Sequence, residues 1–149
     1  MDYAAERELL MQVAWHYLGT PYIWAGDDPS GFDCSGFAIE CLQSVGILPR
    51  KGDWSAAALF EMFKAHPAGP YPQPGDLAFY RGDSGAIIHV EIMVDSKRSI
   101  GASGGGSANV TVDAAWRRNA YIKVRPVASR TGLAGILDPF QAPAGVVRV

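Results

Sequence analysis

The run Gly31-Phe-Asp-Cys-Ser-Gly-Phe37 decides the fold, because it stands where a Gly-, Pro- and Asp-rich segment gives way to an apolar pattern of helical spacing. The pattern predicts a helix over residues 34–45, with Asp33 as its N-cap and Gly46 as its stop. Cys34 then lies in the first turn, where unpaired N–H groups and the helix dipole favour a thiolate. We therefore expect Cys34 to have a lowered pKa and to act as a nucleophile.

Cys41 lies on the apolar stripe of the same predicted helix, without a glycine-rich approach or a polar flank. We interpret Cys41 as a core residue, which is the ordinary role of a free cysteine and is also the alternative for Cys34. A disulfide between the two is not expected, because positions seven apart on one helix are separated by about 10 Å.

One histidine has a context that suits catalysis. His89 lies in the strand-like run Ile87-Ile-His-Val-Glu-Ile-Met-Val94. A neutral imidazole beside a thiol can take its proton and return it to a leaving group. His16 falls in a predicted helix and His66 in a Pro- and Gly-rich loop, so neither is a comparable candidate. The pattern indicates a cysteine hydrolase; a histidine satisfied within the sheet is the alternative.

Several patches of the sequence resemble the NlpC/P60 family of cell-wall peptidases, and they occur in the family's order between Gly19 and Ser103. They are Gly19-Thr-Pro-Tyr-Ile-Trp-Ala-Gly26, Phe32-Asp-Cys-Ser-Gly-Phe37, Pro74-Gly-Asp-Leu-Ala-Phe-Tyr80 and His89-Val-Glu-Ile92. The resemblance implies a papain-like α+β fold, with the helix that carries the thiol packed against an antiparallel sheet. It also implies hydrolysis of an amide in the peptidoglycan stem peptide, typically between D-glutamate and a diamino acid, through a thioester.

Carried over by position, the resemblance assigns roles to five residues. Cys34 would be the nucleophile and His89 the base. Tyr22 would place its hydroxyl near the thiol, and Asp33 and Ser35 would bind the polar end of the substrate. The alternatives are an aromatic packed under the loop for Tyr22 and helix capping for Asp33 and Ser35.

The sequence departs from the family where a third polar residue usually orients the imidazole, about a dozen positions after the base. The matching residue here is Gly101. A backbone carbonyl near Gly101 could accept the imidazole N–H, since fixing the tautomer needs only an acceptor. Glu91 shares the strand face of His89 and replaces a residue that is commonly small in the family. Ser103 or Asn109 could also fold back; we favour the carbonyl or Glu91.

Composition fits one domain without a cofactor. The 149 residues carry a net charge of −2, which gives no electrostatic footprint for nucleic acid. A local basic patch at Arg117, Arg118, Lys123 and Arg125 is interpreted as solvated surface. No metal-binding motif is present, so we expect neither a metal nor a cofactor. We assign residues 1–131 to the catalytic domain and residues 132–149 to a tail that is packed on it or mobile.

The acidic, amphipathic N-terminus does not resemble a signal peptide, and no segment is long enough to insert in a membrane. We therefore expect synthesis in the cytoplasm and action at the cell wall after delivery by a phage, as a holin-released endolysin or a tail-associated lysin. Two alternatives come from other classes. One is an amidase or acyltransferase of related fold, and the other is a noncatalytic wall-binding or virion structural module.

The remaining pattern predicts helices first and strands afterwards, which is typical of an α+β domain. Helices are expected over residues 3–18, with Leu9 and Leu18 on the apolar face, and over 54–64, with Asp53 as the cap. Strands are expected near 77–81, 87–94, 98–102, 109–112 and 121–127. The Pro- and Gly-rich loop 67–75 is expected to line the far side of the site.

Overall fold

A computed structural model describes residues 3–21, 27–28, 31–103 and 121–141. Within these residues, the helices come first and the main strands follow, so the predicted α+β class is confirmed. The helices are α1 (Ala4–His16), α2 (Cys34–Ser44) and α3 (Ala56–Phe63), with 3₁₀ turns at Val127–Ser129 and Pro139–Gln141. The strands are β1 (Asp27–Asp28), β2 (Gly31–Phe32), β3 (Leu77–Arg81), β4 (Ile87–Met93), β5 (Arg98–Ser103), β6 (Tyr121–Pro126) and β7 (Leu133–Leu137).

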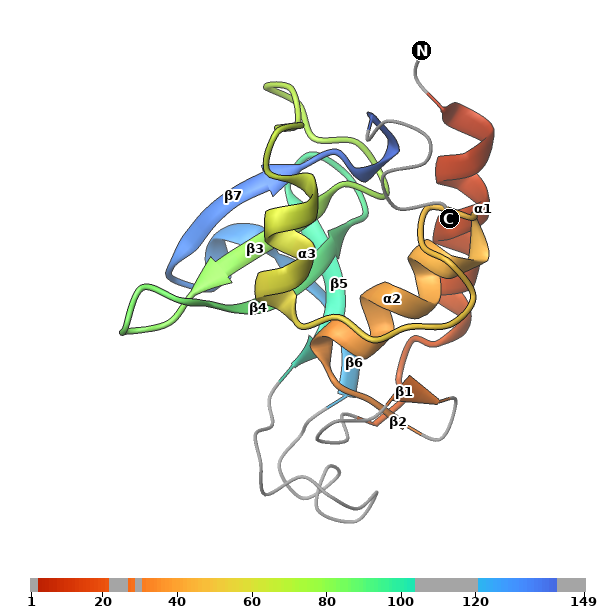
Figure 1. The fold of residues 1–149 in the computed structure, drawn as a ribbon, viewed down its shortest axis with the longest axis horizontal. Helices are drawn as coiled ribbons and strands as arrows, with labels where there is room; N and C mark the ends of the chain where they lie inside the picture. The colour runs from red at the N-terminus through yellow and green to blue at the C-terminus, as the bar shows by residue number, and fades with distance from the viewer. Residues whose placement is uncertain (1–2, 22–26, 29–30, 104–120, 142–149) are drawn as a thin grey trace.

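An antiparallel sheet of order β6-β5-β4-β3-β7 forms the centre of the fold, and the helices pack against it (Figure 1). Neighbouring strands from β3 to β6 follow one another in the chain, and β7 adds to the free edge of β3. A separate pair of very short strands, β1 and β2, precedes α2. The strand β4 lies at the middle of the sheet, which places its residues under α2 and α3.

The helix α2 begins at the predicted residue and ends one residue before the predicted end. Asp33 has extended backbone angles and accepts a hydrogen bond from the Gly36 N–H at 2.6 Å, so it is the N-cap. Gly46, just beyond the helix, has a φ of 77°, which glycine adopts at little cost. Cys41 is fully buried and both cysteines are free, as expected from their positions on this helix.

Alternate residues of the strands face opposite sides of the sheet. On the helix side, a continuous apolar core joins α1, α2 and α3 to Phe79, Val90 and Ile92. On the other side, a smaller cluster contains Ala78, Tyr80 and Met93. The larger apolar area lies under the helices, so their packing on the sheet supplies most of the hydrophobic stabilisation.

Two local expectations are wrong. The helix α1 buries Arg7, Leu10, Met11 and Ala14, while Leu9 and Leu18 are about half exposed. The cap of α3 is Ser55, whose side chain accepts from the Ala58 N–H at 3.1 Å, and not Asp53. Leu133–Leu137, in the segment assigned from the sequence to a tail packed on the domain or mobile, form β7 and pair with β3. The strand expected over 109–112 lies outside the described residues.

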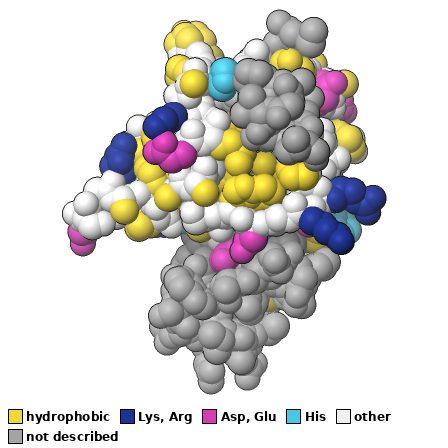
Figure 2. All heavy atoms as spheres, in the orientation of Figure 1, with side chains coloured by type: hydrophobic (Ala, Val, Ile, Leu, Met, Phe, Trp, Pro, Cys, Tyr) yellow, Lys and Arg dark blue, Asp and Glu magenta, His cyan; other side chains and the backbone are white. Residues whose placement is uncertain are grey.

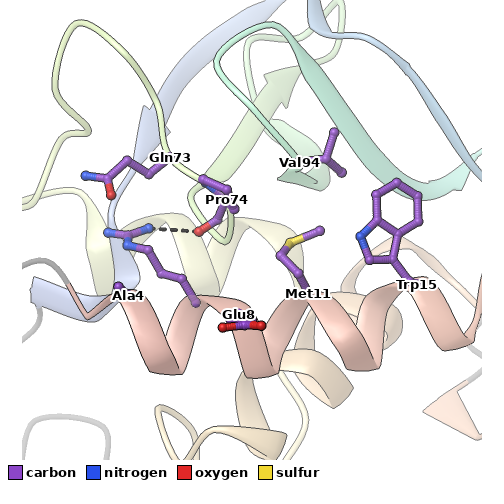
Figure 3. A pocket seen from close by; sticks show the side chains of 8 residues that line it. Ala4, Glu8, Met11, Trp15, Gln73, Pro74 and Val94 are labelled. Atoms are coloured by element: carbon purple, nitrogen blue, oxygen red, sulfur yellow. Dashed lines mark hydrogen bonds between the residues drawn. The ribbon is translucent and has the colours of Figure 1, made fainter.

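The loop 67–75 packs against α1 rather than beside His89. Gly75 donates its N–H to Met93, at the end of β4 remote from His89, and Arg7 donates to the Pro74 carbonyl at 3.1 Å. A cavity of about 420 Å³ lies between this loop and α1, lined mainly by apolar side chains, with Met11, Trp15 and Val94 on one side (Figure 3). Among the described helices, none has the length and apolar character needed to cross a bilayer.

Candidate active site

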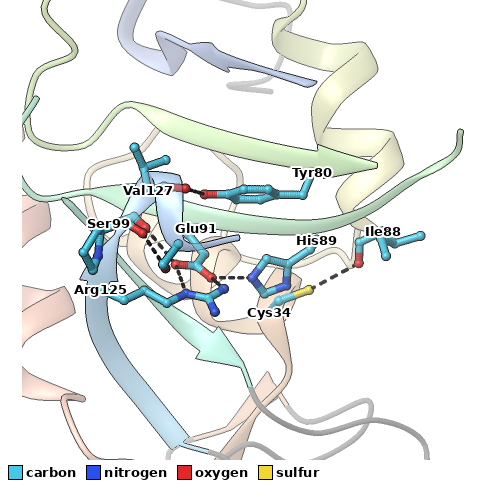
Figure 4. Close-up of polar contacts among 10 residues, drawn as sticks. Cys34, Tyr80, Ile88, His89, Glu91, Ser99, Arg125 and Val127 are labelled. Carbon is cyan, nitrogen blue, oxygen red and sulfur yellow. Dashed lines mark hydrogen bonds and ion pairs between the residues drawn. The ribbon is translucent and has the colours of Figure 1, made fainter. Parts of the chain in front are cut away.

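Cys34 is the first residue of α2, and its half-buried thiol reaches the backbone of β4. The sulfur lies 3.9 Å from the Ile88 carbonyl oxygen, and the Val90 N–H also faces it. These two backbone groups flank His89 in the sequence. Figure 4 shows the Cys34 side chain beside the His89 imidazole. The fold thus brings together the thiol and the histidine that the sequence singled out, 55 positions apart in the chain.

His89 is only 5% exposed, and its ring is held from two sides. Its Nε2 lies 2.6 Å from Glu91 Oε2, and the ring centroid of Tyr80 lies 5.7 Å from that of His89. Tyr80 pairs with His89 across β3 and β4, which explains the ring contact. Its hydroxyl donates to the Val127 carbonyl at 3.1 Å, and this bond fixes the aromatic ring under the imidazole.

Of the groups considered as a partner for the imidazole, the structure places Glu91 against Nε2, rather than the Gly101 carbonyl. Glu91 and His89 are two apart on β4 and share a face. Gly101 makes room for this arrangement, because a Cβ built there would come within 2.5 Å of Glu91 Cγ. Ser103 ends β5, and Asn109 lies outside the described residues.

Two more strands hold the Glu91 carboxylate. Ser99 on β5 donates to Oε1 at 2.8 Å, and Arg125 on β6 forms an ion pair with Oε2 (Figure 4). Arg125 Nε also contacts Oε1 at 3.4 Å, so the guanidinium approaches both oxygens. The interpretation of Arg125 as solvated surface is therefore wrong. The signal that could have revealed it is the alternation of Tyr121, Lys123 and Arg125 along one strand face.

The network sets the charges of its members. Burial alone would raise the pKa of Glu91, but the hydrogen bonds and charges of His89 and Arg125 lower it to about 2. Burial lowers the pKa of His89 below its usual 6.5, and Glu91 opposes this effect. At neutral pH the site therefore holds an ionised carboxylate beside a neutral imidazole. With Nε2 donating to Glu91, Nδ1 is left as the basic nitrogen.

The expectation of a thiolate at Cys34 is wrong for the free protein. Burial raises its pKa to about 11, and the Asp33 charge adds to this effect. The N–H groups of Val90 and Ser35 act in the opposite direction but do not compensate. The helix N-terminus and its dipole are therefore outweighed by desolvation, and the resting pair is a thiol with a neutral imidazole.

The remaining predicted site residues fall into two groups. Asp33 and Ser35 lie at the N-terminus of α2, where Asp33 caps the helix and the Ser35 hydroxyl lies 3.4 Å from Asp33 Oδ1. The capping role is thus present for Asp33, whose carboxylate also accepts from the Ser35 hydroxyl, and substrate binding by either residue stays a prediction. Tyr22 lies outside the described residues. No cluster of His, Cys, Asp and Glu with the geometry of a metal site occurs among the residues that the structure describes.

Comparison with known sequences gives a consistent picture. The chain is 37% identical over 98 residues to the "Probable endopeptidase p60" of Listeria seeligeri, and the aligned region covers 65% of this chain and 18% of that protein. It is 38% identical over 88 residues to a "Gamma-D-glutamyl-L-lysine dipeptidyl-peptidase" of Bacillus cereus, covering 57% of this chain and 25% of that protein. The chain thus spans a quarter or less of the length of these curated relatives.

Known structures share the fold. An NlpC/P60 family protein from Bacillus cereus superposes with a TM-score of 0.68 at 26% identity, over 92% of this chain and 40% of that one. The peptidoglycan hydrolase RipB from Mycobacterium tuberculosis gives a TM-score of 0.65 at 24% identity, over 91% of this chain and 65% of that one, which is a likeness of fold alone. The model of the NlpC/P60 family matches residues 19–127, which include Cys34, His89, Glu91 and Arg125, and the chain therefore belongs to the NlpC/P60 family.

Proposed function

We propose that this chain is a cysteine peptidase that hydrolyses an amide bond in the stem peptides of peptidoglycan. One observation carries the proposal. The Cys34 thiol contacts the two β4 backbone groups that flank His89, and the His89 imidazole is fixed by an ionised carboxylate. This is the arrangement of a nucleophile, a base and an orienting group. The relatives named as endopeptidases and a dipeptidyl-peptidase support the same reaction class.

The charges of the free protein define how the reaction would start. Cys34 holds its proton and His89 is neutral, so His89 accepts the thiol proton as the sulfur attacks the substrate carbonyl. Glu91 then faces an imidazolium, and its negative charge stabilises that ion. The Ser35 N–H in the first turn of α2 is positioned to donate to the oxyanion that forms on the carbonyl.

Attack of the sulfur gives a tetrahedral intermediate that carries the oxyanion, and collapse of this intermediate breaks the amide C–N bond. The imidazolium returns its proton to the departing amine, and the acyl group stays on the sulfur as a thioester. A water molecule, deprotonated by His89, then attacks the thioester. The acid is released and the proton returns to the sulfur, so the site is restored to its starting state.

For the bond that is cut, we propose the amide between D-glutamate and the diamino acid. The name of the Bacillus cereus relative specifies a γ-D-glutamyl bond. The glutamyl residue of such a substrate carries a free α-carboxylate at the opposite end from the reacting γ-carbonyl. Arg130 offers a matching cation. Its guanidinium lies 5.4 Å from the Tyr80 ring, its charge acts on both Cys34 and His89, and it makes no ion pair with any described carboxylate.

The bond can be identified by mass spectrometry of peptides released from purified peptidoglycan. We expect new termini at D-glutamate and at the diamino acid. Arg130→Gln should raise KM for stem peptides with little change in kcat, and Arg50→Gln is the control, since Arg50 lies near the C-terminus of α2. Cleavage at another amide would overturn the bond assignment, and no release at all would overturn the peptidase.

A further inference from the structure

We propose that Arg125 is a positioning residue that keeps His89 neutral by neutralising Glu91. The inference deepens the proposed function and rests on it for its consequence in catalysis. The hydrogen bonds and the ion pair of Arg125 at this site are with the Glu91 carboxylate. The Arg125 charge also lowers the pKa of His89 directly, as a smaller cause than burial. From the sequence, Arg125 was expected to belong to a solvated basic patch. It lies on β6, 36 residues from His89 in the sequence.

One oxygen of Glu91 is shared between two partners. Oε2 accepts from His89 Nε2 at 2.6 Å and also from Arg125, while Oε1 accepts from Ser99. The Glu91 side chain is fully buried and that of Arg125 is 24% exposed. The carboxylate therefore has no access to water, and its charge is compensated by protein groups alone.

Without the guanidinium, this geometry would favour a charged histidine. A buried carboxylate 2.6 Å from an imidazole attracts a proton onto the ring, because the interior screens the ion pair weakly. An imidazolium cannot accept the Cys34 proton, so the base would be inactive over much of the neutral range. Arg125 supplies the positive charge that the carboxylate would otherwise draw from His89.

Other groups around the ring do not provide this compensation. Tyr80 on β3 is a neutral phenol whose pKa is raised by burial, and Cys34 is a neutral thiol. Arg130 contributes a second positive charge but stacks over Tyr80, and the groups that hold the Glu91 carboxylate are His89, Ser99 and Arg125. The titratable and charged groups that face His89 are thus Cys34 from α2, Tyr80 from β3, Glu91 from β4, Arg125 from β6 and Arg130 from the turn before β7.

The direct test is the titration of His89 by NMR in the Cys34→Ala background, which needs no activity. Replacing Arg125 with Gln should raise the His89 pKa by about 1 or more, the effect expected when the positive charge paired with the neighbouring Glu91 carboxylate is lost. Glu91→Gln should lower it, and the Glu91→Gln/Arg125→Gln double variant should fall between the two. The double variant leaves no unpaired buried charge, so it guards against loss of folding. Arg98→Gln is the matched control, because Arg98 pairs with exposed Asp95.

The same variants, made with Cys34 intact, link the inference to catalysis. In Arg125→Gln the acid limb of the kcat/KM profile should move to higher pH together with the His89 titration, with KM little changed. Arg125→Lys keeps the positive charge and should therefore show a smaller shift than Arg125→Gln. An unchanged His89 pKa in a folded Arg125→Gln variant overturns the inference. If the titration shifts but peptidoglycan is not cleaved by the parent protein, the positioning role stands and the proposed function fails.

Discussion

The two faces of β4 differ sharply, although their residues alternate along one strand. Val90 and Ile92 point to the helices and are fully buried in the apolar core. His89 and Glu91 point to the other side and are almost as deeply buried, but among polar groups. Burial on one face contributes hydrophobic stability; on the other it tunes protonation.

The comparison teaches that this fold separates its stability from its chemistry by the period of a strand. The core face fixes the position of the β4 backbone, and the backbone carries both the Cys34 contact and the His89 ring. Substitutions on the two faces should therefore have opposite signatures, one in the free energy of unfolding and the other in kinetics.

The largest contrast is expected between His89→Ala and Val90→Ala. Loss of the base should lower kcat/KM by roughly 10²- to 10⁴-fold, with little effect on unfolding by denaturant. Val90→Ala should cost about 1–3 kcal/mol of stability through the cavity it leaves, with nearly normal kinetics. Equal kinetic losses in both variants would show that the two faces are not separable.

The Glu91 carboxylate should make stability depend on acid. Its pKa is about 2 in the folded protein against 4.5 when unfolded, so its contribution is fully present above pH 4.5. As pH falls from 4.5 towards 2, about 3 kcal/mol should be lost. Urea unfolding of wild type and Glu91→Gln at a series of pH values measures this. If the variant loses stability as steeply as the wild type, the carboxylate is not the acid-sensitive group.

Alkylation compares the two cysteines of α2. With a pKa of about 11, Cys34 should react slowly with iodoacetamide at neutral pH. Its rate should rise about tenfold for each pH unit between neutral pH and that pKa. Cys41 is fully buried and its pKa is raised further by burial, so it should react more slowly throughout. Peptide mapping after timed labelling gives both rates. A Cys34 rate that is already at its plateau near pH 7 would reveal a thiolate paired with an imidazolium.

The smallest effect is expected at Gly101. An added Cβ would meet Glu91 Cγ at 2.5 Å, so Gly101→Ala should displace the carboxylate and cost about 1–3 kcal/mol through overpacking. Turnover should fall with it, because Glu91 holds His89. Gly135→Ala on β7 is the control, since a Cβ there meets nothing within 4 Å. Thermal unfolding and kcat/KM of both variants would show whether Gly101 is needed for space.

Local patterns were enough to predict the parts of the site that depend on neighbours in the sequence. The N-cap at Asp33, the helix from Cys34 and the strand around His89 each follow from a few adjacent residues. The placement of Glu91 beside His89 follows from strand alternation. Pairing across strands could not be predicted: Arg125 reaches Glu91 only because β6 adds next to β5.

Two other features escaped sequence analysis because they depend on tertiary packing. The Cys34 pKa is set by how far the sheet buries the thiol, and this outweighs the helix terminus that the sequence revealed. The strand β7 lacks a clear period of its own and is fixed by the open edge of β3. Its residue pattern alone did not predict that it would form the edge strand of the sheet.

The central claim is that the sulfur of Cys34, and not that of Cys41, forms the thioester. The most direct measurement is the release of peptides from purified peptidoglycan by Cys34→Ala and Cys41→Ala, which remove the same atom from one helix. We expect no release from a folded Cys34→Ala protein and near-normal specific activity from whatever fraction of Cys41→Ala is folded. Retained hydrolysis by Cys34→Ala would contradict the account.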